Sequence, residues 1–433
     1  MQFYKPISQI TAKDIRSCGP KAVSLAKLNN SGFTVPDGIC ITSHAYEHFI
    51  KETGVDKYIA KELNRKDIAS MRWEEIWDTY IRIRSSFIKT DFSANLQDII
   101  KNAIIKHIGS DYTAVRSSSP EEDSSKTSFA GLHDSYVMVK GSDNILKHIK
   151  LVWSSLFSTS SLIYRKDNPQ WINTASMAVL IQKLVQSKKS GVIFTVNPVN
   201  PQTGMIESVW GYNKGLVDGT IEPFSWVINR KTRELVNYTK PKEHLMLDDP
   251  VNNKVKKVKH SLPPLDKRNV VRLFKNAMDI EKIFHTSQDI EWTRDEKNMF
   301  FLQARPITTI KNNKLNTVIE KDKQLRPDIA KLYRMEKTIN HTILPGMKKD
   351  IQSTEQLKLS EMKEHELLNT AQSLFVRYTK WKKAYWDYLI PFAHAFRIFG
   401  EIYNQRMQPQ DPHEYIKLLN SDDMISVKRN KEL

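Results

Sequence analysis

The segment from Asp289 to Thr308 contains the residues whose types and spacing are best suited to chemistry. Two runs rich in Ile, Trp, Phe and Leu flank a polar turn at residues 293–298, which is the pattern of a β-hairpin. Because side chains alternate between the two faces of a strand, the hairpin should have one polar and one apolar face. The polar face would carry Asp289, Glu291, Gln303 and Arg305, and the apolar face Ile290, Trp292, Leu302 and Ala304.

Glu291, Gln303 and Arg305 could together form a site for Mg²⁺ and phosphate. Mg²⁺ is usually held by one or two protein oxygens together with nucleotide phosphates, and a carboxylate and an amide would supply such oxygens. Arginine grips phosphate oxygens through paired N–H donors. The spacing fits equally well a hairpin whose polar face is only solvated, so both interpretations stay open at this point.

A second set of phosphate-binding candidates lies further upstream. The β-like run from Tyr112 ends in Arg116 and three serines, which could place a guanidinium and small donors at a strand end. The loop at residues 124–133 has small residues that let backbone N–H groups approach phosphates, but it has one glycine and no P-loop pattern. An ordinary loop explains it equally well. Lys21 could hold phosphate, although a single helical lysine is usually just solvated.

The composition is that of a globular protein. The chain has 433 residues, of which 40% are hydrophobic and 27% charged, enough for two or three domains. Its two cysteines, Cys18 and Cys40, cannot form a disulfide framework and fit a reducing compartment. No apolar run reaches the roughly 18 residues of a membrane span, and the N-terminus lacks the apolar core of a signal peptide. We therefore expect a cytoplasmic protein without a membrane partner.

The formal net charge of +17 does not by itself identify a partner. Lys and Arg are spread along the chain, and the densest basic run, residues 254–260, is short and not interleaved with aromatic residues. That pattern is more typical of a solvated loop or edge strand than of a nucleic-acid-binding surface. It is also compatible with a positive field that attracts nucleotide. We expect no nucleic-acid partner.

Composition divides the chain into four segments and predicts an α+β fold. Residues 1–176 are α-rich with short strands, residues 177–310 are β-rich, residues 311–327 form a polar linker, and residues 328–433 are helical. Apolar spacing predicts a helix that starts near Pro20, a helix capped by Ser43, and one long amphipathic helix over residues 142–166.

Residues 375–403 are unusually aromatic. The stripe comprises Tyr378, Trp381, Tyr385, Trp386, Tyr388, Phe392, Phe396 and Phe399. We interpret it as a helix–helix core. The alternative is an aromatic pocket for a flat substrate or a docking face for a partner. Pro391 should bend or break the helix.

Eight short motifs occur along residues 10–308. They are GPKAVSL at 19–25, VPDG at 35–38, VRSS at 115–118, SFAG at 128–131, MAVLIQ at 177–182, GVIFTVNP at 191–198, ESVWG at 207–211 and QARPIT at 303–308. Together, and in this order, they resemble the N-terminal nucleotide-binding portion of the phosphoenolpyruvate synthase, pyruvate phosphate dikinase and rifampicin phosphotransferase family. The resemblance implies an ATP-grasp fold of two α+β subdomains, with ATP and Mg²⁺ as cofactors.

The resemblance also assigns residues to the nucleotide. Lys21 and Arg116 would hold the triphosphate and act in catalysis. The loop from Ser128 to Gly131 would close over the phosphates, and Gln182 would lie along the adenine.

The resemblance implies that residues of the hairpin bind the metal ion and take part in phosphoryl transfer. Glu291 and Gln303 would hold Mg²⁺, and Arg305 would stabilise charge on the phosphoryl group in flight. Glu207 matches an acidic position near the nucleotide. Both Glu207 and Gln182 could instead simply satisfy hydrogen bonds at a sheet edge.

The chain departs from the family pattern after Gly211. Where the family often has Gly-Leu-Gly-Glu, this chain has Gly-Tyr-Asn-Lys, so Lys214 replaces an acid, and Phe224 follows Pro223 where the family has Asp. These changes leave the expected phosphate-binding groups in place. They put the loop geometry, the nucleotide preference and the rate in doubt.

Full-length family members continue with a swivelling domain whose histidine takes the phosphoryl group, and with a third domain that serves the acceptor. No glycine-rich strip around a histidine follows Thr308. We therefore expect a component that binds Mg-ATP and phosphorylates a histidine on a separate swivel-domain protein or on missing C-terminal domains, forming AMP and phosphate, with a small molecule as final acceptor. The alternative is a catalytically weak, ATP-binding regulatory or scaffold subunit.

Overall fold

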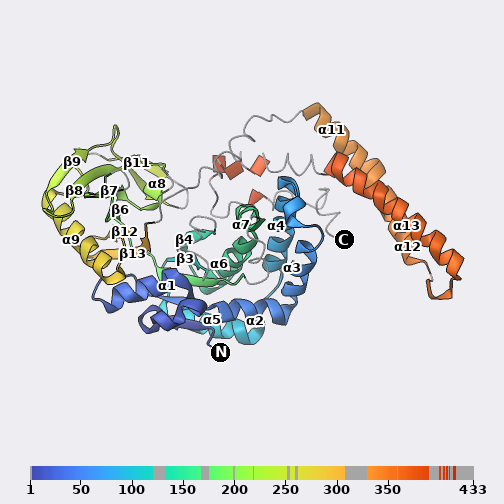
Figure 1. Ribbon diagram of the computed structural model, residues 1–433, viewed down its shortest axis with the longest axis horizontal. Coiled ribbons are helices and arrows are strands. Elements are labelled where there is room, and N and C mark those ends of the chain that lie inside the picture. Colours follow the sequence, from blue (N-terminus) through green and yellow to red (C-terminus); the bar gives the residue numbers. More distant parts are fainter. Residues whose placement is uncertain are drawn as a thin grey trace. The chain divides into compact units, whose positions relative to one another are not determined.

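The computed structural model describes most of the chain. The described residues are 2–119, 133–166, 175–197, 200–217, 219–250, 254–258, 262–307, 329–357, 359–389, 399–400, 403–404, 406–407, 409 and 413–415. The chain divides into two compact units, residues 1–310 and 311–433. Each unit is described by itself (Figure 1).

The first unit mixes helices and strands, so the predicted α+β class is confirmed. Its helices are α1 Ile15–Asn30, α2 Ser43–Thr53, α3 Val55–Leu63, α4 Trp73–Lys89, α5 Ala94–His107, α6 Ser142–Ser154, α7 Thr159–Lys166, α8 Lys214–Val217 and α9 Lys267–Phe284. Its strands are β1 Tyr4–Pro6, β2 Gly38–Ile41, β3 Thr113–Ser118, β4 Ser135–Val139, β5 Ala178–Lys183, β6 Lys189–Phe194, β7 Thr203–Gly211, β8 Phe224–Asn229, β9 Leu235–Thr239, β10 Leu245–Asp249, β11 Lys254–Lys257, β12 Gln288–Arg294 and β13 Met299–Pro306.

The first sheet has five strands in the order β1-β2-β5-β3-β4, and every neighbouring pair is antiparallel. One of its faces packs against α2 to α7 through a large apolar core. In this core the ring of Trp153 lies 5.7 Å from that of Tyr46 and 5.3 Å from that of Phe49. Because β5 pairs between β2 and β3, the strand that follows the predicted boundary at residues 176/177 still belongs to this first sheet.

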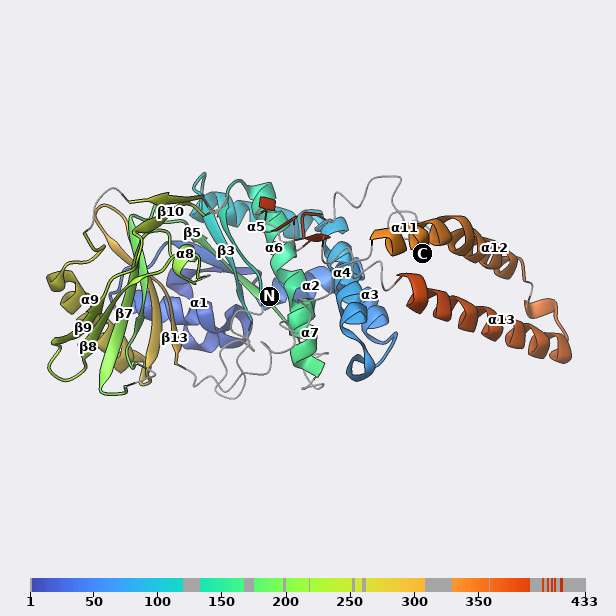
Figure 2. The ribbon, with the colours of Figure 1, turned by 90° about the horizontal axis from the view of Figure 1, so that it is seen from above.

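The second sheet has eight strands. Six follow the order β11-β10-β7-β6-β12-β13, while β8 pairs with β7 and β9 pairs with β8. One face of this sheet packs against α1 and α9 in a second core, and that core also includes Ala178 and Leu180 of the first sheet. Helix α1 therefore lies between the two sheets (Figure 2), and it sets how the two sheets approach each other.

Helix α1 is interrupted at Gly19, as the Gly-Pro sequence requires. Gly19 has φ 74° and ψ 165°, and the helix resumes from Pro20. At this break the Ser118 hydroxyl, at the end of β3, donates to Cys18 O (2.7 Å) and accepts from Ala22 N (3.3 Å). The serine thus caps the resumed helix, which begins at Pro20 as predicted, and ties it to the strand that carries Arg116.

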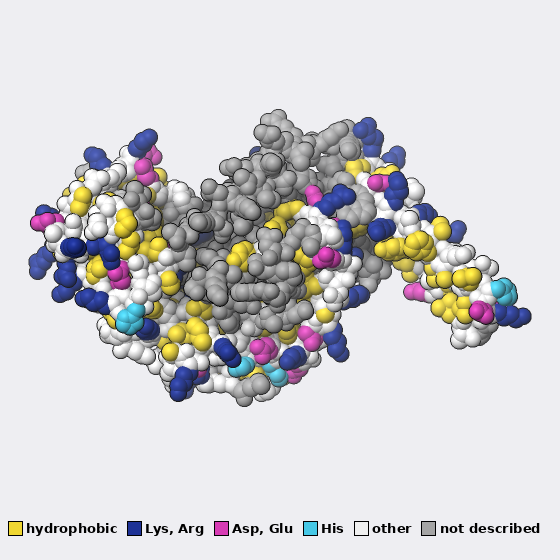
Figure 3. All heavy atoms as spheres, viewed as in Figure 1, with side chains coloured by type: hydrophobic (Ala, Val, Ile, Leu, Met, Phe, Trp, Pro, Cys, Tyr) yellow, Lys and Arg dark blue, Asp and Glu magenta, His cyan; other side chains and the backbone are white. Residues whose placement is uncertain are grey.

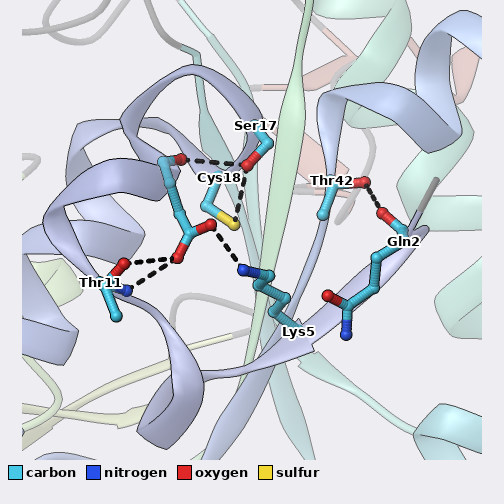
Figure 4. Close-up of polar contacts among 7 residues, drawn as sticks. Gln2, Lys5, Thr11, Ser17, Cys18 and Thr42 are labelled. Carbon is cyan, nitrogen blue, oxygen red and sulfur yellow. Dashed lines mark hydrogen bonds and ion pairs between the residues drawn. The ribbon is translucent and has the colours of Figure 1, made fainter.

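The chain before the break is held by side-chain contacts that involve Lys5, Thr11 and Ser17, which are labelled in Figure 4. Lys5 Nζ on β1 lies 2.6 Å from Asp14 Oδ1, and Thr11 N donates to Asp14 Oδ2 (2.9 Å). The Ser17 hydroxyl lies 3.8 Å from the sulfur of Cys18, which is fully buried. Both ends of the break in α1 are therefore held to the first sheet.

Two sequence-based helix predictions need correction. The long helix expected over residues 142–166 is broken between α6 and α7 by the 3-10 turn Ser155–Phe157 and by extended Ser158, whose hydroxyl accepts from Ser161 N (3.2 Å) and starts α7. Helix α2 does begin at Ser43, but its N-cap residue is Thr42, and the Ser43 hydroxyl donates to Arg16 O (3.2 Å) instead of capping the helix.

The second unit is helical in its described part. Its elements are α11 Ile329–Thr338, a π-helical segment Ile339–Ile343, α12 Leu344–Glu355, α13 Glu364–Ala384 and a second π-helical segment Tyr385–Leu389. Trp381 Nε1 donates to Asp350 Oδ2 (3.0 Å), and Arg377 donates to Ser353 Oγ (2.7 Å), so α12 and α13 run antiparallel.

The aromatic stripe is only partly a core. Trp381, Tyr385 and Tyr388 pack against a small buried cluster at the two π-helical segments. Tyr378 is 60% exposed. Pro391, Phe392 and Phe396 lie outside the described residues. The helix–helix interpretation therefore holds for Trp381, Tyr385 and Tyr388, in the middle of the stripe.

On the face drawn in Figure 3, basic side chains are spread over several elements, including strands and helices of the first unit. Within the described part of the chain, no helix is long and apolar enough to cross a membrane.

Replacing Gly19 by alanine should destabilise the first unit strongly. A Cβ there would lie 2.1 Å from Ser118 O, and its left-handed φ is unfavourable for alanine. Gly32 has a similar φ of 86° but nothing within 4 Å of its Cβ position. Gly32→Ala should therefore lower the free energy of unfolding only by the cost of the left-handed backbone conformation, roughly 1–2 kcal/mol. Urea unfolding measures the free energy of unfolding of both variants. An equal decrease in Gly19→Ala and Gly32→Ala would contradict the close approach of Ser118 to Gly19.

Candidate functional site

The predicted hairpin is present, and its register brings the polar residues together. In the pairing of β12 with β13, Glu291 lies opposite Gln303 and Asp289 lies opposite Arg305. Residues directly opposite each other share a face of the sheet. The turn is closed by Asp295, whose carboxylate accepts hydrogen bonds from Lys297 N (2.7 Å) and Asn298 N (2.6 Å).

A β-bulge at Leu302 corrects one part of the prediction. The register shifts after Glu291, so that Trp292 pairs with Phe301 and Leu302 is the extra residue. Phe301 therefore joins Ala304 in the core, in the place expected for Leu302. A bulge bends its strand and leaves one residue outside the regular ladder. Here the Leu302 carbonyl accepts a hydrogen bond from Arg116 Nη1 (3.4 Å).

The polar row extends beyond the hairpin onto the open face of the second sheet. Across five neighbouring strands the paired residues are Gln303, Glu291, Val192, Glu207 and Ser225. Glu207 therefore lies on the same face as Glu291, although β7 is distant from β12 in the sequence. Burial, together with the negative charge of Asp289, raises the pKa of the Glu207 carboxyl. β7 pairs on both sides, so Glu207 is not at a sheet edge.

Arg116 links the two sheets. It extends from β3 of the first sheet to β12 of the second, where its Nη2 lies 3.3 Å from Glu291 Oε2. Both side chains are largely buried, with 20% and 16% exposed. The structure thus brings together a predicted triphosphate ligand and a predicted metal ligand.

Arg305 is paired with Asp289, a residue on the predicted polar face that we had not assigned to the site. Its Nε and Nη2 lie 2.8 and 2.7 Å from the same oxygen, Asp289 Oδ2. A planar guanidinium held through two of its nitrogens has a fixed orientation. Asp289 is therefore the residue that orients Arg305.

The remaining predicted ligands are placed as follows. Lys21 Nζ, just after the break in α1, donates to Ser117 Oγ (3.3 Å) at the end of β3. Gln182 is 3% exposed on β5, and its Nε2 has no hydrogen-bond partner among the described residues. β5 is an interior strand, so Gln182 does not serve a sheet edge. Ser128 and Gly131 lie outside the described residues.

Asn213 is a site residue that the sequence analysis missed. Its Nδ2 donates to Glu291 Oε2 (3.4 Å), whereas the neighbouring Lys214 donates to Pro250 O (2.8 Å). The signal was present in the departure from the family motif at residues 211–214, which we interpreted as affecting loop geometry, nucleotide preference and rate, and not as a contact with Glu291.

The oxygen donors fit a magnesium ion that is shared with phosphates. In the described part of the chain, no group of three or more His, Cys, Asp or Glu side chains could hold a metal ion. Glu291 and Gln303 nevertheless offer a carboxylate and an amide, and Asn213 Oδ1 is buried without a partner among the described residues. A small set of hard oxygens is what a nucleotide-bound Mg²⁺ takes from a protein.

Replacing Glu207 by glutamine should stabilise the first unit at neutral pH. A carboxyl whose pKa is raised by folding holds its proton more tightly in the native state, so its contribution to stability is lost as the pH rises through the raised pKa. Glu207→Gln should therefore melt a few degrees higher than the wild type at pH 7, with the difference fading below pH ~4.5. Thermal melts measure this, with exposed Glu234→Gln as control. If the melting temperature of Glu207→Gln is lower than that of the wild type by the same amount at pH 7 and at acidic pH, then Glu207 accepts stabilising hydrogen bonds instead.

Comparison with known proteins identifies the family of this chain. Residues 15–326 match the family model described as pyruvate phosphate dikinase, AMP/ATP-binding domain. A "Probable phosphoenolpyruvate synthase" of Methanocaldococcus jannaschii is 32% identical over 326 residues, covering 72% of this chain and 27% of the relative. The "Phosphoenolpyruvate synthase" of Aeropyrum pernix is 32% identical over 331 residues, covering 67% and 40%.

A third relative extends further along the chain. The "Probable phosphoenolpyruvate synthase" of Staphylothermus marinus is 29% identical over 414 residues, covering 85% of this chain and 49% of the relative. The matches thus span between about a quarter and a half of the relatives' length. The family model covers well over half of this chain. The chain belongs to the pyruvate phosphate dikinase AMP/ATP-binding domain family.

Proposed function

We propose that this chain binds Mg-ATP where its two sheets meet, in an ATP-grasp arrangement, and transfers a phosphoryl group to a histidine on a separate swivel domain or subunit. One water molecule is consumed, because the second phosphoryl unit leaves as phosphate, and AMP is the other product. The observation that carries the proposal is the convergence of Arg116, Glu291, Gln303 and Arg305 at one face of the second sheet. Two guanidinium groups beside hard oxygen ligands suit a metal-bound triphosphate.

The Arg116–Glu291 ion pair suits a site that exchanges partners when nucleotide binds. Without nucleotide, each side chain neutralises the other in a largely buried position, which avoids the cost of an unpaired buried charge. With Mg-ATP bound, Glu291 would turn to the metal and Arg116 to the phosphates, so both charges stay compensated. Lys21, beside the capped break in α1, would add a third cation to the phosphates.

Arg305 would act on the phosphoryl group in transfer. Phosphoryl transfer depends on positioning and on electrostatic stabilisation rather than on covalent chemistry by the protein. The Asp289 carboxylate holds the Arg305 guanidinium through Nε and Nη2. A preoriented cation needs little reorganisation when charge develops at the phosphoryl group. This assigns Arg305 to catalysis and Asp289 to its positioning.

The partner and the final acceptor are part of the proposal. The curated relatives are named phosphoenolpyruvate synthases, and each extends well beyond the region that matches this chain. We propose that the phosphorylated histidine belongs to a separate swivel-domain protein or to C-terminal domains, and that a small molecule takes the phosphoryl group last.

A regulatory or scaffold role is the second candidate. The observation that favours it is Lys214, which stands where the family often has an acid and donates to Pro250 O (2.8 Å). An acid lost near the nucleotide could leave binding intact and slow the transfer. The two candidates differ in one product, because only the transferase forms AMP.

Arg305→Ala should lower AMP formation about 10²–10³-fold, while changing ATP affinity much less. The measurement combines calorimetric titration of Mg-ATP with chromatographic detection of AMP, in the presence of a histidine swivel domain of a phosphoenolpyruvate synthase. Arg294→Ala, at the end of the same strand β12, is the matched control and should keep wild-type activity.

The outcomes separate the candidates. ATP binding without AMP in the wild type would favour the scaffold role. Absence of Mg-ATP binding by a folded wild type would refute both candidates.

A further inference from the structure

We propose that Asn213 is a further ligand of the nucleotide-bound metal ion and the residue that holds Glu291 in position for it. The inference rests on the proposed Mg-ATP function. It starts from a side chain that is 8% exposed and has a buried oxygen, Oδ1, with no hydrogen-bond partner among the described residues. Its other amide atom, Nδ2, faces the Glu291 carboxylate at 3.4 Å.

The backbone before Asn213 explains how the side chain reaches the site. Strand β7 ends at Gly211, which has φ 77°, and a Cβ at this position would lie 2.4 Å from Leu247 O on β10. Glycine therefore allows β10 to approach closely and the chain to turn. The turn directs the next residues back towards β12, where Glu291 lies. Asn213 comes two residues after Gly211, and its Nδ2 reaches Glu291 Oε2.

The Asn213 side chain does not cap α8, although the residue stands directly before that helix. Its carbonyl accepts from Leu216 N and Val217 N, both at 3.0 Å, so it occupies the N-cap position of α8. An asparagine at an N-cap normally accepts a backbone N–H with its side-chain oxygen. Here the side chain turns to Glu291 and leaves Oδ1 without a partner among the described residues, which is unfavourable for a buried acceptor. A ligand that binds this oxygen would supply the missing partner.

The neighbouring charges indicate that the ligand is a cation. The amide orientation follows from the contact, because a carboxylate can accept from the NH₂ group but would repel the oxygen. Oδ1 then lies beside Glu291, which is paired across the hairpin with Gln303. A carboxylate and two amide oxygens are hard ligands suited to Mg²⁺. Lys214, which would compete with a cation, is bonded instead to Pro250 O.

Asn213 also explains how Glu291 could stay in place when nucleotide binds. In this structure Glu291 Oε2 accepts from both Arg116 and Asn213. If Arg116 turns to the phosphates, the Asn213 amide remains as a donor to the carboxylate. Groups that orient a metal ligand typically change metal affinity 10–100-fold when removed.

The test measures the Mg²⁺ dependence of ATP binding by calorimetry. Asn213→Ala should raise the Mg²⁺ concentration needed for half-maximal ATP binding about 10–100-fold, with ATP binding in the absence of Mg²⁺ unchanged. Asn213→Asp keeps an oxygen for the metal but replaces the amide donor to Glu291 with a like charge, so it should recover only part of the Mg²⁺ dependence that the alanine variant loses. Asn237→Ala, an exposed asparagine on β9, is the matched control and should leave the Mg²⁺ dependence unaltered.

A second readout distinguishes a ligand from a structural residue. The alanine removes an unsatisfied buried oxygen together with one long hydrogen bond to Glu291, so the nucleotide-free melting temperature of Asn213→Ala should stay close to that of the wild type. A folded Asn213→Ala protein with wild-type Mg²⁺ dependence would overturn the inference while leaving the proposed function intact. An Asn213→Asp variant as impaired as the alanine variant would overturn the ligand role. A wild-type protein that binds no Mg-ATP would refute the proposed function itself.

Discussion

The contact between Arg116 and Glu291 is the interaction on which the arrangement of the site depends. It connects the end of β3 in the first sheet to the middle of β12 in the second, and it forms only if the two sheets are held at the correct separation. Helix α1 provides that separation, since its apolar side chains are shared by a core that includes both sheets. The break at Gly19, capped by Ser118, ties this helix to the strand that carries Arg116. Packing and site geometry are therefore set by the same few elements.

The open face of the second sheet has an electrostatic character that suits a cation. Glu207, Asp289 and Glu291 lie on this face, and the cationic groups in contact with the last two are Arg305 and Arg116. The raised pKa of Glu207 reflects burial and the charge of Asp289. A divalent cation at this face would relieve the repulsion between carboxylates.

In the second unit, aromatic composition predicted the packing of the helices only in part. The aromatic stripe was expected to form a helix–helix core, and Trp381 does pack between α12 and α13, where Gly346 allows its ring to approach. Further towards the start of α13, Phe375 is 69% exposed. Aromatic content predicts that apolar surface will be buried somewhere, but it does not say which rings have a partner. That depends on where the facing helix ends.

The sequence by itself determined the local features of this protein. The alternation of residues 289–305 determined the hairpin and its polar face, the Gly-Pro pair determined the start of a helix at Pro20, and the ordered motifs determined the family. These features depend on neighbouring residues and on strand or helix periodicity. Only the tertiary structure decided that Leu302 is a bulge, that Asp289 orients Arg305, and that Asn213 and Arg116 both meet Glu291. Such contacts join segments far apart in the chain, and their distances are set by how α1 packs between two sheets, which no local pattern encodes.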